Sequence, residues 1–280
     1  RDKKAALNST TTVLVYIAYA FVIIPLFSIL YEIFRLGIGG LSFGIFTKDM
    51  SLTSSDSPLT EGGLLHALIG TLYVVVLASI ISTPVGILAS LYIVEVKGRF
   101  AGLVRFFIQA MSGIPSIVAG LFIYAIWMIN MGNSYNAVAG AGALAILMIP
   151  TVARTSEEVL KLVPDDLRSS AYAVGASQMA TTFRIVLPTA RSGLITASML
   201  GLARVAGETA PLILTAYYSA VYSLKVTGQP LASLPMYIFG LLQIGTENAL
   251  NRAWAGSLIL LLLVFGLFSL ARYVGGKDKR

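Results

Sequence analysis

The hydrophobic positions of this chain gather into six long runs separated by more polar segments. A membrane-spanning helix needs about 20 mostly apolar residues to cross roughly 30 Å of hydrocarbon, and each run approaches or exceeds that length. The pattern therefore predicts an all-α, polytopic membrane protein with six transmembrane helices, the first of which is an N-terminal anchor. The predicted spans lie within residues 12–34, 63–94, 106–130, 137–153, 192–217 and 253–274.

Composition supports this prediction. Of the 280 residues, 56% are hydrophobic and only 12% are charged, which is too apolar for a typical soluble domain. Prolines fall inside the runs, where neighbouring helices or polar side chains can satisfy the backbone groups that a proline frees. We expect kinks at Pro25, Pro84, Pro115 and Pro211.

Lysine and arginine are distributed unevenly over the loops, and the cytoplasmic loops of membrane proteins are enriched in both. With both termini on one side, that side holds 15 of the 20 basic residues, the other side holds four, and Arg204 lies within a span. We predict a multi-pass protein of the cell (cytoplasmic or inner) membrane with both termini in the cytoplasm. The net charge of +7 follows from this orientation and gives no indication of nucleic-acid binding.

The residue inventory excludes several kinds of chemistry. The chain has no cysteine and a single histidine, which excludes disulfides, thiol catalysis and Cys/His metal sites. It has no GxxxxGK[ST] pattern, so it cannot cradle ATP phosphates as a P-loop does. We expect no catalytic residues, no metal and no cofactor bound by this chain. His66, near the outer end of the second run, is either a polar helix-end residue or part of a proton relay.

The longest cytoplasmic loop, residues 154–191, predicts two short helices. Pro164 followed by two aspartates is typical of a helix start, and Gly175 is typical of a helix end. Ser177 can cap a second helix that runs to Pro188.

Two roles are open for this pair of helices. It is either an amphipathic hairpin on the membrane surface or a docking knob whose exposed side chains enter the groove of a cytoplasmic partner. The side chains that we expect the first helix to expose are Leu167, Ala171, Tyr172 and Val174.

Residues 169–188 resemble the EAA motif of binding-protein-dependent ABC importer permeases. That pattern is Glu-Ala-Ala, three residues, Gly, nine residues, Ile, any residue and Leu-Pro. The matching positions are Ala171, Gly175, Ile185, Leu187 and Pro188. Ser169 and Ser170 replace the glutamate and the first alanine, a departure that concerns a salt bridge to the ATPase and leaves the docking geometry unchanged.

The resemblance implies the type I ABC importer permease fold, with coupling helices within residues 155–188 that sit in a groove of a separate ATP-hydrolysing subunit. ATP would then be used by that partner, and this chain would be a transport subunit without enzyme activity. The residues implied to couple to the ATPase are Leu167, Ala171, Tyr172, Gly175, Ile185, Leu187 and Pro188.

Further segments resemble the phosphate-importer branch of this family, from about residue 60 to the C-terminus. The most discriminating pieces are "GETAPL" within residues 205–216 and "SLP" within residues 230–240. This resemblance implies half of a translocation pathway for inorganic phosphate. The implied partners are a homologous permease, two ATP-binding subunits and an extracytoplasmic phosphate-binding protein. Residues 1–62 would form the anchor and first outer loop, and residues 63–275 the transport domain.

Arg204 and Glu208 stand four residues apart inside an otherwise apolar run. A charge at the centre of a span costs about 2.5–3.5 kcal/mol, so such residues normally face a partner or a water-filled cavity. On a continuous helix the two would share one face and could form an ion pair. The pair either fixes helix packing or lines the substrate pathway, where the arginine would lower the barrier for an anion. The resemblance favours the pathway.

Three weaker candidates remain. Glu95, at the inner end of the second span, is expected to be a solvated boundary residue. Small residues around Pro115 either line a path through a broken helix or serve helix contacts. In the outer loop, residues 217–251, an apolar segment either folds back into the outer mouth or contacts the binding protein, and its residues for that contact are Leu234, Met236 and Tyr237.

Two other functions stay open at this stage. The chain could be a permease for another oxyanion, sulfate or molybdate, or a non-transporting membrane scaffold for phosphate sensing. Competition by sulfate would separate the oxyanions, and partner-dependent phosphate uptake would separate a permease from a scaffold.

Overall fold

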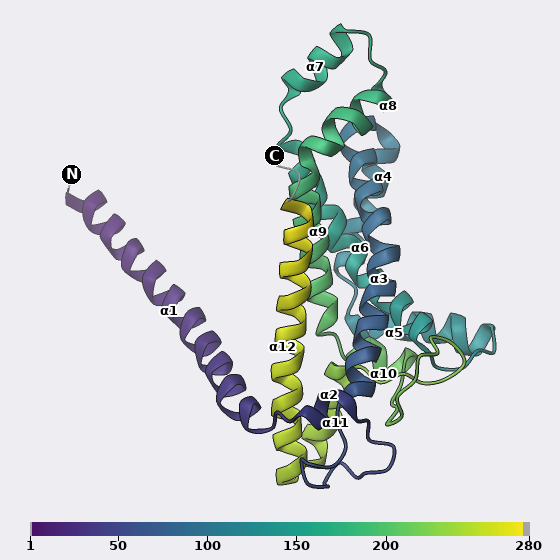
Figure 1. The fold of residues 1–280 in the computed structure, drawn as a ribbon. Coiled ribbons are helices and arrows are strands. Elements are labelled where there is room, and N and C mark those ends of the chain that lie inside the picture. Colours follow the sequence, from purple (N-terminus) through teal and green to yellow (C-terminus); the bar gives the residue numbers. More distant parts are fainter. Residues whose placement is uncertain (1, 277–280) are drawn as a thin grey trace.

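The computed structural model describes residues 2–276, and all regular secondary structure in this range is helical (Figure 1). The predicted all-α class is confirmed. The α-helices are α1 (Asp2–Gly39), α2 (Phe43–Thr47), α3 (Leu65–Leu91), α4 (Arg99–Ser112), α5 (Ser116–Tyr124), α6 (Ala137–Lys161), α7 (Asp165–Ala173), α8 (Gln178–Thr181), α9 (Leu187–Ala206), α10 (Ala210–Thr215), α11 (Leu234–Ile244) and α12 (Glu247–Gly276). The π-helical segments are η1 (Tyr92–Val96), η2 (Ala125–Asn130) and η3 (Thr182–Val186).

Five helical runs are long and apolar enough to cross a membrane, and a sixth span results when the bent pair of α4 and α5 counts as one. The predicted set of six spans is thus confirmed. The five runs are Thr10–Gly39, Leu65–Val96, Ala137–Lys161, Gln178–Ala206 and Glu247–Tyr273.

The third span is broken, where a kink was expected. Its halves, Arg99–Ser112 and Ser116–Asn130, meet at 102°. Pro115 lies in this break with an extended backbone, and the residue before a proline is itself pushed out of the helical conformation. Pro25 and Pro84, by contrast, lie inside α1 and α3, which continue through them.

The fifth span starts and ends earlier than predicted. The hydroxyl of Ser177 accepts a hydrogen bond from the Ala180 N–H at 3.2 Å and so caps α8 as expected. The helical run does not end at Pro188, because that proline occupies the first turn of α9. At its other end α9 stops at Ala206, well before the predicted residue 217.

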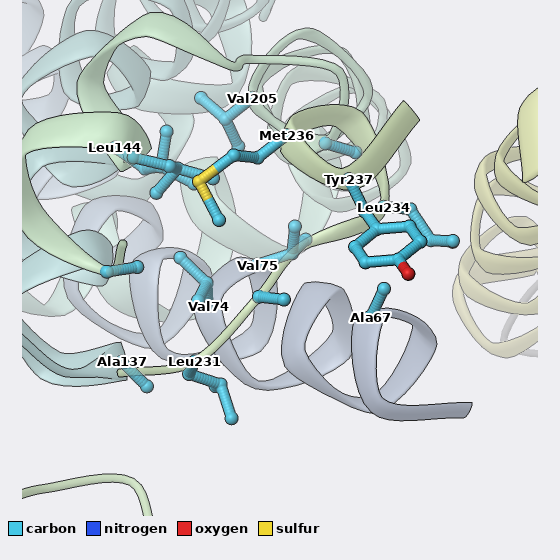
Figure 2. Close-up of a cluster of buried hydrophobic side chains, with 14 of the residues drawn as sticks. Ala67, Val74, Val75, Ala137, Leu144, Val205, Leu231, Leu234, Met236 and Tyr237 are labelled. Carbon is cyan, nitrogen blue, oxygen red and sulfur yellow. The ribbon is translucent and has the colours of Figure 1, made fainter. Parts of the chain in front are cut away.

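The core lies where α3, α6, α9, α11 and α12 meet (Figure 2). Val152 of α6 is closely approached by two neighbouring helices. A Cβ added to Gly86 of α3 would lie 2.8 Å from its side chain, and one added to Gly201 of α9 would lie 2.7 Å away. Small residues at such positions let membrane helices pack closely, and they hold this part of α6 firmly in the bundle.

The two ends of the bundle differ, as Figure 1 shows. Helices α7 and α8 project from one end, and α11 lies at the other with the loops around it. Helix α1 diverges from the bundle, and no position in its apolar window is buried. It touches α12 near Gly37, where an added Cβ would lie 2.8 Å from Leu258. The first turns of α1 and the last turns of α12 lie toward the end that carries α7.

Candidate coupling and transport sites

Helices α7 and α8, which we call the coupling hairpin, have the arrangement that the sequence predicts. Between them Gly175 has a φ of +84°, a conformation that glycine adopts most readily and that commonly ends helices. Leu167, Tyr172 and Val174 are 39%, 45% and 85% exposed. The hairpin thus presents an apolar surface away from the bundle, as a docking segment requires.

Ala171 was expected on that exposed surface, and this expectation is wrong. It is only 4% exposed, because it stands three residues after Arg168, on the side of α7 that faces the bundle. The later motif positions lie in the chain that returns to the bundle. Ile185 and Leu187 are half-buried, and Pro188 is exposed.

Glu95 is not the solvated boundary residue that we expected. Its side chain is 7% exposed and accepts two hydrogen bonds from Arg168 of α7, from Nη2 at 2.9 Å and from Nε at 3.2 Å. The two residues are 73 positions apart in the sequence. No local pattern could reveal this contact, because it depends on where α7 folds against the inner end of α3.

Arg204 lies in the last turn of α9, and its side chain is exposed within this chain. Its Nη1 donates a hydrogen bond to the hydroxyl of Thr151 at 3.1 Å. Thr151 lies on α6 next to Val152, so it belongs to the part of α6 that Gly201 and Gly86 hold in place. Sequence reasoning missed Thr151, because a single threonine in an apolar run is unremarkable.

Glu208 does not share a helix face with Arg204, so the expected i, i+4 pairing is wrong. Helix α9 ends at Ala206, and α10 begins only at Ala210. The cause is Pro211, which has no N–H for the carbonyl of Gly207 and therefore prevents the helix from continuing through this point. No ion pair joins the two side chains among the described residues.

The two interrupted helical runs lie against each other. A Cβ added to Gly120 of α5 would lie 2.6 Å from the Cα of Pro211 in α10, so the two backbones touch near the start of the helix that follows each break. Gly113 lies next to the first break. A Cβ added to it would have one neighbouring atom within 4 Å, the Ala110 carbonyl oxygen at 3.5 Å. Gly113 therefore does not serve a tight helix contact within this chain.

At the end opposite the coupling hairpin, α11 folds back into the bundle. Leu234, Met236 and Tyr237 are buried in the core (Figure 2), which argues against the binding-protein contact that was one of their two predicted roles.

Burial raises the pKa of Asp49 in the nearby loop, but hydrogen bonds from Tyr222 and Ser51 outweigh that effect, so its pKa is lowered overall.

Arg252 of α12 holds the first outer loop. Its buried guanidinium donates hydrogen bonds to four backbone carbonyls of that loop, at 2.8–3.3 Å. These carbonyls belong to Ser55, Ser57, Pro58 and Glu61. Arg252 therefore fixes this loop to the first turns of α12.

His66 is buried in α3 with its ring edge-on to Tyr237, the ring centroids being 4.7 Å apart. Among the described residues, neither ring nitrogen has a hydrogen-bond partner. Within the same residues, no group of three His, Cys, Asp or Glu side chains could hold a metal ion.

Comparison with known proteins agrees with this arrangement. Residues 82–277 match the family described as binding-protein-dependent transport system inner membrane component. The phosphate transport system permease protein PstA of Haemophilus influenzae is 38% identical over 90% of this chain and 88% of its own length. The PstA of Yersinia pestis is 36% identical over 100% and 94%, and PstA 1 of Mycobacterium tuberculosis is 34% identical over 98% and 90%.

Solved structures with the same fold are also ABC importers. A bacterial ABC transporter involved in the import of the acidic polysaccharide alginate has a TM-score of 0.65, with 15% identity over 95% of this chain and 96% of its own. The MetNI methionine ABC transporter in an inward-facing conformation has a TM-score of 0.54, with 22% identity over 77% and 92%. The type I importer permease fold is confirmed.

Proposed function

Because the chain belongs to the family of binding-protein-dependent transport system inner membrane components, we propose that it is the PstA-type permease subunit of an ATP-driven importer for inorganic phosphate. It forms half of the translocation pathway. Three relatives named as phosphate transport permeases, each matched over 88% or more of its length, support this assignment.

The state of Arg204 is the observation that carries the proposal. An arginine within a span is costly, by about 2.5–3.5 kcal/mol at the helix centre, unless it faces a partner or water. Here its guanidinium is exposed, and the hydrogen bond described for it goes to an uncharged hydroxyl. The positive charge is therefore not neutralised by a carboxylate, and it can lower the barrier for an anion that passes through the bundle.

Glu208 completes the substrate pathway. It lies in the break between α9 and α10, four residues beyond Arg204. Phosphate at neutral pH still carries a proton and can donate a hydrogen bond to a carboxylate, whereas sulfate cannot. Glu208 thus supplies the discrimination between the two oxyanions that a positive charge alone does not give.

The coupling hairpin connects this chain to the subunit that hydrolyses ATP. Leu167 and Tyr172 dock into the groove of an ATP-binding subunit, and Ala171, Gly175, Ile185, Leu187 and Pro188 hold the hairpin in its shape. ATP is bound and hydrolysed by that partner, and this chain binds no cofactor of its own. The exposed apolar surface of α7 and the motif spacing support this role.

The assembly contains a companion permease of the PstC type, a dimer of PstB-type ATP-binding subunits and an extracytoplasmic PstS-type phosphate-binding protein. The chain crosses the cell membrane several times with both termini in the cytoplasm. Residues 1–62 form the anchor helix and first outer loop, and residues 63–275 form the transport domain. The clustering of basic residues near the coupling hairpin supports this orientation.

The test is uptake of labelled phosphate by proteoliposomes that contain the whole importer. We expect uptake that requires ATP and the binding protein, that a tenfold excess of sulfate does not inhibit, and that Arg204→Gln abolishes while the complex still assembles. Inhibition by sulfate would indicate a permease for another oxyanion. Full assembly with no uptake by the unmodified complex would indicate a scaffold.

A further inference from the structure

Arg168 of α7 uses its whole hydrogen-bonding capacity. Its five N–H donors form five hydrogen bonds with four acceptor atoms, two of the bonds going to the same oxygen of Glu95 at 2.9 and 3.2 Å. The others go to the Val163 carbonyl at 2.6 Å, the Leu160 carbonyl at 3.2 Å and the Asp165 carboxylate at 3.1 Å. One side chain thus connects α7 to the inner end of the second span and to the carbonyls that end α6.

Glu95 receives bonds from both helices of the coupling hairpin. Its carboxylate bonds to Arg168 of α7, and its backbone carbonyl accepts a hydrogen bond from Gln178 of α8 at 2.7 Å. Glu95 lies in η1, which continues the helix of α3. We call these three residues, Glu95, Arg168 and Gln178, the inner joint.

The surroundings of the inner joint are firm on one side and open on the other. Below it a buried apolar cluster joins α3, α6 and α9, and its residues are Leu91, Leu160, Val163, Val186, Ala190 and Leu194. Between the hairpin and the start of α4 lies a cavity of about 620 Å³, lined in part by Gly98, Ala101 and Tyr172. A movement of α7 would therefore push directly on the end of α3, whereas the cavity separates α7 from α4.

We propose that the inner joint is the rigid link through which movement of the coupling hairpin reaches α3. Glu95 and Arg168 are positioning residues for ATP-driven transport, and they contact neither substrate nor nucleotide. The inference rests on the proposed docking of the hairpin to an ATP-binding subunit. It goes further by assigning the transmission of that movement to particular residues outside the matched motif positions.

Fixed geometry explains this pair better than stability does. Taking two charges out of water costs as much as their attraction returns, so a buried ion pair adds little net stability. What it does supply is one defined arrangement, because a planar guanidinium with five satisfied donors has a single orientation. A lysine has three donors on a flexible stem and could not replace the five hydrogen bonds.

The first test compares ATP hydrolysis and phosphate uptake in the same proteoliposomes containing the complete importer. For Glu95→Gln and Arg168→Lys we expect normal co-purification of the ATP-binding subunits and hydrolysis within about twofold of normal. Uptake per ATP should fall about tenfold, which corresponds to roughly 1.4 kcal/mol of lost coupling. The matched control is Glu158→Gln, a nearby carboxylate that is 73% exposed and should change nothing.

Gln178→Ala removes one bond of the inner joint without leaving a buried charge, so it tests the link even if the charged variants do not assemble. We expect uptake per ATP to fall about threefold, the effect of one hydrogen bond. An unchanged ratio in all assembling variants would overturn the inference. So would a parallel loss of hydrolysis and uptake, because that would show a role in docking and none in transmission.

A second test does not depend on which anion is carried. The chain has no cysteine, so spin labels can be introduced at Val174, Leu88 and Phe265, which are exposed in this chain, before the importer is assembled. On ATP binding, the distance from position 174 to position 88 should stay constant, while that from 88 to 265 changes. In Glu95→Gln the first distance should change and the second should not.

The outcomes separate the two proposals. A distance from 174 to 88 that changes in the unmodified importer overturns the rigid link and leaves the proposed function intact. Absence of any ATP-dependent change at all three positions, together with no phosphate uptake, contradicts the proposed function itself.

Discussion

The inner joint and the end of α9 each combine an arginine with a glutamate, and the two arrangements are opposite. At the inner joint, Arg168 and Glu95 are both nearly buried, with side chains 13% and 7% exposed, and every donor of the arginine is used. In the last turn of α9, Arg204 is exposed, bonds to the hydroxyl of Thr151, and has no ion pair with the glutamate four residues on.

The difference shows how the surroundings of a charge decide what it can do. A neutralised and fully bonded guanidinium has no capacity left for a ligand, but it fixes the position of two helices. A guanidinium held by one neutral hydroxyl keeps its charge and most of its donors for an anion. The predictions below test this contrast between a charge that fixes structure and one that remains free to bind.

Charge reversal should give the largest effects and should separate the two sites most clearly. Arg204→Glu is expected to lower phosphate uptake at least about 100-fold, because an attraction becomes a repulsion, while the complex assembles normally. Arg168→Glu places two carboxylates together in a buried site and should prevent assembly, since breaking a buried pair costs about 3–5 kcal/mol. Uptake assays and co-purification distinguish the outcomes.

Lysine substitutions should give the next largest contrast. Arg204→Lys keeps the charge and should retain uptake within about threefold, whereas Arg168→Lys cannot replace the five hydrogen bonds and should lower uptake per ATP about tenfold. The same proteoliposome assay measures uptake and ATP hydrolysis for both variants. Equal effects of the two lysines would contradict the contrast, because the sites would then demand the same property of their arginines.

The sequence predicts much of this fold for clear physical reasons. Long apolar runs have one stable form in lipid, so the helices around residues 12–34 and 253–274 were foreseeable. The hairpin was equally readable, because Gly175 and Ser177 act on their immediate neighbours and the motif spacing is specific. These features depend on local chemistry, which a sequence displays directly.

The parts that could not be predicted depend on distant contacts or on combined local effects. The partner of Glu95 comes from 73 residues away, and only the folded position of α7 brings it there. The break before Pro211 was underestimated as a kink, because a proline in lipid can be tolerated within a helix, as Pro84 is. Whether a helix bends or ends at a proline depends on whether neighbouring groups can donate a hydrogen bond to the carbonyl that the proline leaves unpaired.

Removing the break should convert the open site into a closed one. In Pro211→Ala the helix can continue through residues 207–210, which would place Glu208 on one face with Arg204 and let the two form an ion pair. We expect uptake to fall about fivefold, as the arginine becomes partly neutralised. Adding Glu208→Gln to this variant should raise phosphate uptake to the level of Glu208→Gln alone, the control, in which the arginine stays free but selection against sulfate is lost. A double variant no better than Pro211→Ala would show that the break itself is needed.

Thr151 should give the smallest effect and the finest test of the open arginine. Its hydroxyl orients Arg204 without neutralising it, so Thr151→Val should raise the phosphate concentration for half-maximal uptake about threefold, the effect of one hydrogen bond. ATP hydrolysis should not change, and Thr151→Ser, which keeps the hydroxyl, should behave normally. Thr196 is the matched control, because its hydroxyl bonds only within α9, to the Ser192 carbonyl at 2.9 Å. If Thr151→Val and Thr196→Val behave alike, the neutral hydroxyl does not position the arginine, and the contrast with the inner joint rests on charge alone.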